Sequence, residues 1–156
     1  MLQPTLESTL AGRYSLAWTS FGMPVFEIER SQLAQVATLL RDAHGFELLL
    51  DVTAVDRIGQ QPRFELVVHL FSPALRQRVR LKAVVPEDDA VVPTLSTLYG
   101  SARFLEREAH EMFGIRFEGN ADLRPILLYE GFVGHPLRKD YPMEREQPIV
   151  EYRTQP

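Results

Sequence analysis

The chain has 156 residues, a formal net charge of −4 and no cysteine. This length suits one domain with a core of its own, and the negative charge argues against nucleic-acid binding, which depends on clustered lysine and arginine. Without cysteine, the chain cannot form a disulfide or offer a thiolate to an iron–sulfur cluster or a zinc ion.

The first half of the chain alternates between strand and helix patterns. Residues 1–12 lack the basic start and apolar core of a signal peptide, and no apolar run approaches the ~18 residues of a membrane span, so a soluble, cytoplasmic chain is expected. Two short strands follow at 14–19 and 25–29, around a turn at 21–24. Ser31 is the expected N-cap of an amphipathic helix that ends at Gly45.

The middle of the chain is rich in Val, Leu and Phe and is broken by Gly and Pro, as is typical of strands. We expect three strands, at residues 46–55, 64–71 and 75–85. Two helices should follow, one at 91–99 with Pro93 in its first turn and one from Ser101 as N-cap to Gly114. This order predicts an α+β fold, a two-layer sandwich of a mixed sheet with helices over residues 1–114. Residues 115–156 should form an extended irregular C-terminal arm.

The third expected strand of this group carries a row of basic side chains. Its apolar residues share one parity and Arg76, Arg78, Arg80 and Lys82 share the other, which predicts one apolar and one basic sheet face. This row suits an acidic partner, although a solvated face or a charge-protected edge is the more common outcome.

The helix near residue 104 is highly charged. On a helical projection that starts from Phe104, the apolar side chains form one arc that includes Glu108, with Glu106 just beyond its edge. A carboxylate on an apolar face needs a partner, and we expect Arg124 or Arg138 to supply it. A structural ion pair is favoured over a tuned acid.

The same helix offers two metal-ligand types one turn apart, Glu106 and His110. No second such pair accompanies them, so a surface pair is favoured over a metal centre. The chain also lacks the glycine-rich loops of dinucleotide and nucleoside triphosphate sites and the nucleophile elbow of hydrolases. No active site is expected in this chain.

Two late segments carry a family resemblance. Residues 105–115 read LEREAHEMFGI and residues 134–142 read GHPLRKDYP. Together they resemble the C subunit of proton-translocating NADH–quinone oxidoreductase, which belongs to the peripheral arm of respiratory complex I. Segments 50–56 and 92–99 are also similar to that family.

The resemblance implies a structural and assembly subunit with no cofactor of its own. It would dock on the quinone-site subunit, which is related to hydrogenase large subunits, and beside iron–sulfur subunits. Iron–sulfur clusters, FMN, NADH and quinone would belong to partner chains, and so would electron transfer and ion pumping. The chain would lie on the cytoplasmic face of the cell membrane and meet the membrane only through the complex.

On this reading, eight residues hold the subunit interface and the tail: Glu106, Arg107, Glu108, Arg124, Leu137, Arg138, Lys139 and Asp140. Arginine and tyrosine are enriched at such interfaces, which favours an arm covered by a partner over one folded on its own core.

Three alternatives remain open from the sequence. The chain could be the equivalent subunit of a membrane-bound nickel–iron hydrogenase or of a ferredoxin-linked relative. It could also be a stand-alone metalloenzyme that uses Glu106 and His110, or a free peptide-binding module.

Overall fold

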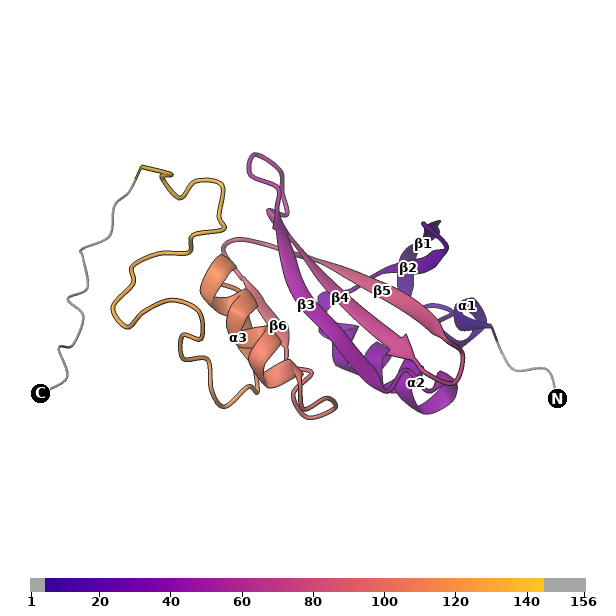
Figure 1. The fold of residues 1–156 in the computed structure, drawn as a ribbon. Coiled ribbons are helices and arrows are strands. Elements are labelled where there is room, and N and C mark those ends of the chain that lie inside the picture. Colours follow the sequence, from indigo (N-terminus) through magenta and orange to yellow (C-terminus); the bar gives the residue numbers. More distant parts are fainter. Residues whose placement is uncertain (1–4, 145–156) are drawn as a thin grey trace, which may run out of the picture.

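The structure is a computed structural model that describes residues 5–144 (Figure 1). Residues 1–4 of the expected domain and residues 145–156 of the expected arm lie outside the described residues. Within 5–144, no helix has the length and apolar character needed to cross a membrane.

A five-stranded mixed sheet forms the body, in the order β1-β2-β5-β4-β3. Its strands are β1 (Tyr14–Ser20), β2 (Met23–Ile28), β3 (Leu48–Asp56), β4 (Phe64–Ser72) and β5 (Gln77–Val85). Neighbouring strands run antiparallel except β2 and β5, which are parallel. The α+β class and the mixed sheet predicted from the sequence are confirmed.

Helices cover one face of this sheet. A short α1 (Leu6–Thr9) comes first, and α2 (Leu33–His44) lies beneath the sheet in Figure 1. The apolar stripe of α2 is fully buried against the sheet, and the helix ends at Gly45, whose φ of 66° suits glycine. Ser31 is not its N-cap, because a single 3-10 turn, η1 (Arg30–Gln32), precedes α2. The helix α3 (Ala102–Phe113) packs against β3.

The prediction of a helix at residues 91–99 is wrong. Residues Val91–Pro93 form a strand, β6, that pairs in parallel with β7 (Arg116–Glu118) in a second, two-stranded sheet. Two consecutive valines favour a strand, and a partner from beyond α3 supplies the backbone hydrogen bonds. Residues 95–99 form only a turn, closed by the amide of Tyr99 donating to the carbonyl of Leu95.

Three further details differ from the prediction, besides shifts of one or two residues at other strand ends. The strand expected from residue 75 begins at Gln77, because residues 73–76 form the hairpin turn and Arg76 has a positive φ of 49°. Ser101 gives α3 no side-chain cap, since its hydroxyl donates to the carbonyl of Leu49. Residues 116–118, which lie in the expected irregular arm, form the strand β7.

Residues 119–144 contain no helix or strand, and we call this segment the strap. It is the orange-to-yellow trace beside α3 in Figure 1.

Candidate functional site

The apolar face that α3 turns inward is largely the predicted one, but the inward carboxylate is not. Ala109, Met112 and Phe113 are buried, as is Ala102 at the start of the helix, and Phe104 is exposed. Glu106 is completely buried, and Glu108 is exposed. The prediction of Glu108 as the inward carboxylate is therefore wrong, because the buried arc extends past its predicted edge to Glu106 and does not include Glu108.

Glu106 sits in a cage of neutral hydrogen-bond donors. Its carboxylate accepts from the backbone amide of Leu95 at 2.6 Å, from the hydroxyl of Thr94 at 2.6 Å and from the side-chain amide of Asn120 at 2.8 Å. Burial raises the pKa of Glu106, and the hydrogen bonds from Thr94, Leu95 and Asn120 oppose that rise. The cage joins α3 to the loop after β6 and to the start of the strap.

Glu106 and His110 do not act as a pair. The imidazole Nδ1 of His110 lies 2.9 Å from the carbonyl oxygen of Ile115, while the Glu106 oxygens face the cage. Among residues 5–144, no group of three or more His, Cys, Asp or Glu side chains is arranged to hold a metal ion.

Two charged side chains of α3 hold the first half of the strap. Glu111 is buried, and its carboxylate accepts from three successive backbone amides, those of residues 126, 127 and 128, at 2.9–3.3 Å. Arg107 donates to the carbonyls of Arg124 and Pro125 at 2.8 and 2.7 Å. Arg124 itself is exposed and pairs with Asp122, whose pKa the guanidinium lowers. Arg124 therefore does not reach Glu108.

The second half of the strap caps the C-terminus of α3. Carbonyl groups in the last turn of a helix lack partners within the helix. The Glu111 carbonyl oxygen lies 2.8 Å from Nδ1 of His135, that of Met112 accepts from the amide of Leu137, and that of Phe113 accepts from Nε of Arg138 at 2.6 Å. Burial lowers the pKa of His135, which favours its neutral form.

Gly114, which ends α3, makes this approach possible. It has a φ of 79°, and a Cβ at this position would lie 2.5 Å from Nη2 of Arg138 and 2.7 Å from Nε2 of His135. A side chain would thus strain the backbone and also push the strap away.

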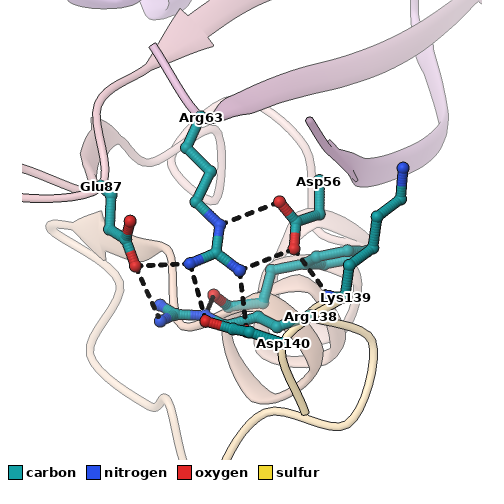
Figure 2. Close-up of polar contacts among 7 residues, drawn as sticks. Asp56, Arg63, Glu87, Arg138, Lys139 and Asp140 are labelled. Carbon is teal, nitrogen blue, oxygen red and sulfur yellow. Dashed lines mark hydrogen bonds and ion pairs between the residues drawn. The ribbon is translucent and has the colours of Figure 1, made fainter. Parts of the chain in front are cut away.

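A group of charged residues fixes the end of the strap to the body, and we call it the clamp: Asp56, Arg63, Glu87, Arg138 and Asp140 (Figure 2). The guanidinium of Arg63 makes a two-pronged contact with Asp56 at 2.8 and 2.9 Å. It also donates to Glu87 at 2.6 Å and to Asp140 of the strap at 2.9 Å. Asp56 accepts in addition from the backbone amide of Lys139 at 2.7 Å.

The centre of the clamp is buried. The side chains of Arg63 and Asp56 are only 5% and 1% exposed, and Arg63 and Arg138 each lie 5.1 Å from the ring centre of Phe64. The hydrogen bonds from Arg63 lower the pKa of both Asp56 and Asp140. At neutral pH the strap is therefore held by ionised carboxylates around one buried cation.

The eight predicted residues thus separate into groups. Glu106, Arg107, Arg138 and Asp140 point inward and fix the strap, and Lys139 does so through its backbone amide. The side chains of Glu108, Arg124 and Leu137 are exposed. The sequence reading missed Asp56, Arg63, Glu87 and Glu111. Asp56 and Arg63 could have been found, because a charged residue beside a buried strand indicates a buried ion pair.

The outer side of the strap carries exposed apolar side chains: Ile126, Leu127, Tyr129, Val133, Leu137 and Met143. Leu127, Val133 and Leu137 are 62%, 58% and 53% exposed. Phe132 stacks on Tyr141 with ring centres 6.0 Å apart, so the strap also packs on itself. Exposed apolar side chains gathered on one segment that buried charges hold in place are typical of a protein–protein contact.

The chain is similar to known proteins over most of its length. Residues 26–147 match the family described as respiratory-chain NADH dehydrogenase, 30 Kd subunit. The C subunit of the NADH-quinone oxidoreductase of Geobacter sulfurreducens is 42% identical over 118 residues, which cover 75% of this chain and 73% of that protein. The protein of the same name from Herpetosiphon aurantiacus is 46% identical over 122 residues, 77% of this chain and 71% of that one.

Solved structures share the fold. The trypsin-resistant fragment (1–134) of Nqo5 has a TM-score of 0.64 and 32% identity, over 76% of this chain and 96% of that one. A chain of an archaeal respiratory membrane complex, the membrane-bound sulfane sulfur reductase, has a TM-score of 0.78 over 96% of this chain and 95% of its own. Its identity is 24%, so that likeness concerns the fold alone.

Proposed function

The chain belongs to the family of the 30 Kd subunit of respiratory-chain NADH dehydrogenase, and we propose that it is a structural subunit of the peripheral arm of such a complex. In this role it docks on the quinone-site subunit and lies beside iron–sulfur subunits, at the cytoplasmic face of the membrane. The apolar outer side of the strap is its main contact surface.

The observation that carries this proposal is the two-sided strap. Its polar groups point inward, to α3 and the clamp, while Leu127, Val133 and Leu137 face outward. A free monomer gains nothing from fixing exposed apolar side chains in one position, whereas an interface gains a preorganised surface.

We propose further that the chain holds no cofactor, and that electron transfer from NADH to quinone takes place in partner chains. The absence of cysteine excludes thiolate ligation of an iron–sulfur cluster by these 156 residues. Of the two candidate ligands on α3, Glu106 already accepts three hydrogen bonds from its cage, and Nδ1 of His110 lies against the carbonyl of Ile115.

The division of the chain into a body and an arm is part of this proposal. The expected units were residues 1–114 and 115–156. Because β7 pairs with β6, we propose that the contact segment begins after Glu118.

The first test is purification of the tagged chain from its native membranes, with mass spectrometry of the proteins that accompany it. Quinone-site and iron–sulfur subunits of a NADH–quinone oxidoreductase should be found. Recovery of the chain alone would refute the proposed role.

A second test concerns the contact surface. Leu137→Asp should leave the thermal stability of the isolated chain nearly unchanged, since this side chain is largely exposed, yet reduce the amount of chain recovered in the complex. Ile58→Asp is a matched control, because Ile58 is similarly exposed but lies between β3 and β4, outside the strap. Equal recovery of the two variants would contradict the contact surface.

A further inference from the structure

The sheet face opposite α2 is open along β5. Side chains in β5 alternate, with Val79, Leu81 and Ala83 buried in the core and Arg78, Arg80 and Lys82 on the other face. The prediction of one apolar and one basic face is confirmed for residues 77–85, and Arg76 leaves the row because it lies in the hairpin turn.

A β-bulge shapes this open face. The pairing of β3 with β4 passes from Leu49 opposite Leu70 to Asp51 opposite His69, so Leu50 is the extra residue. A bulge of this kind redirects side chains. Leu50 is exposed although both neighbours on its strand pair with β4, and it borders a hollow of about 280 Å³ together with Asp51, His69, Arg78, Arg80 and Met23. We call this hollow the arginine notch.

The polar groups of the notch leave one positive charge without a counter-charge. Nε of Arg80 donates to Nε2 of His69 at 2.8 Å, so His69 carries its proton on Nδ1, the nitrogen that lies 3.9 Å from the carboxylate of Asp51. Burial, together with the charge of Arg80, lowers the pKa of His69 and favours the neutral ring. Two arginines and one aspartate then give a net charge of +1.

The arginines of the notch have hydrogen-bond donors that are not used within the chain. Among residues 5–144, the side chain of Arg78 forms no hydrogen bond or ion pair, and the guanidinium of Arg80 uses only Nε. Lys82, the next basic residue on this face, is different, because it is neutralised by Glu65 at 2.7 Å. Unused guanidinium nitrogens on two side chains of one strand suit a planar carboxylate, which accepts two parallel hydrogen bonds.

We propose that the arginine notch receives an aspartate or glutamate side chain of a partner subunit, so that the open sheet face is a second docking surface of the chain. The hollow has room for one acidic side chain, and the exposed Leu50 at its border gives the flanking residues of the partner an apolar contact. One carboxylate restores neutrality. This inference rests on the proposed role in a complex.

Carbodiimide crosslinking of the purified complex tests the contact, because this reagent joins an amine directly to a touching carboxylate. In an Arg78→Lys variant, the new amine should couple to an Asp or Glu of a partner subunit. An Arg76→Lys variant should give no such product, since residue 76 lies outside the notch. Lys82 and Glu65 of the same chain serve as the internal positive control.

Charge reversal gives the energetic test. Arg78→Glu should lower the recovery of the chain in the complex at moderate salt by roughly tenfold relative to Arg76→Glu, which makes the same change of charge. If the amine of the Arg78→Lys variant couples only within its own chain, or to no protein carboxylate, the inference is overturned even if the chain is recovered with its partners. If no partner subunit is recovered with the unsubstituted chain, the proposed function is overturned instead.

Discussion

Replacing Arg63 by methionine should destabilise the protein strongly, because Arg63 is the buried cation around which the clamp is built. The substitution keeps much of the side-chain volume and removes the charge that neutralises Asp56, which is almost fully buried. Removing one partner of a buried ion pair costs about 3–5 kcal/mol. Asp140 and Glu87 are half-exposed and remain hydrated, so they add little. Asp56 keeps the hydrogen bond from the amide of Lys139. We therefore expect a loss of about 3 kcal/mol in the free energy of unfolding at pH 7.

The pH dependence of this loss follows from Asp56. In the unsubstituted protein the pKa of Asp56 is lowered, chiefly by the hydrogen bond from Arg63, so its stabilisation is present above the ordinary aspartate pKa and is lost as the pH falls through the folded value. In the variant, burial without a cation raises this pKa, and protonation relieves the cost. The difference between the two proteins should therefore shrink by about 1 kcal/mol or more between pH 7 and pH 4.

Urea unfolding of the isolated chain at both pH values measures these quantities. Arg57→Met is the control, because Arg57 also pairs with a carboxylate, that of Glu65, but is 42% exposed. It should cost less than about 1 kcal/mol. Equal losses for the two variants at pH 7, or a loss for Arg63→Met that does not change with pH, would refute the role given to the clamp.

Four further changes test other parts of the site. Gly114→Ala should lower the free energy of unfolding, measured in urea, by about 1–2 kcal/mol, because residue 114 has a positive φ and the new methyl group would collide with Arg138. Glu111→Ala should speed hydrogen exchange of the amides of residues 126–128, which lose their acceptor, while amides of α2 stay unchanged. Glu106→Gln should cost about 1–3 kcal/mol by thermal unfolding, since one hydrogen-bond donor of the cage would then face another donor. Burial raises the pKa of Tyr99 to about 12, so stability should fall as the pH rises from about 10 to 12, and Tyr99→Phe should remove this part of the alkaline loss in a titration followed by tyrosinate absorbance.

Much of the body was predictable from local patterns. Alternating side chains located β5, and the helical spacing of apolar residues with a final glycine located α2. These signals are reliable because a strand and a helix with one buried face each repeat their apolar residues at a fixed spacing. That spacing can be read from consecutive residues.

The errors share a different cause, which is contact between residues far apart in the chain. Val91 and Val92 became a strand because β7, some 25 residues later, offers a partner. The inward carboxylate of α3 was misjudged because Glu106 is held inside by hydrogen bonds from Thr94 and Asn120. A helical projection contains no information about hydrogen-bond donors on other segments, so it placed Glu106 just outside the buried arc.

The charged motif at residues 137–140 was also misread because its contacts lie far away in the chain. A run of Arg138, Lys139 and Asp140 beside Leu137 looks like an interface in sequence, since such charges normally face solvent or a partner. In the fold, Arg138 pairs with the carboxylate of Glu87 and Asp140 with the guanidinium of Arg63, both on the body and more than 50 residues away in the chain. Only the side chains of Leu137 and Lys139 face outward. The charges thus fix the position of the strap, whereas the apolar side chains of its outer side stay exposed. Loss of the clamp and loss of the surface should consequently have separable effects, because the first lowers the stability of the isolated chain and the second lowers only its recovery in the complex.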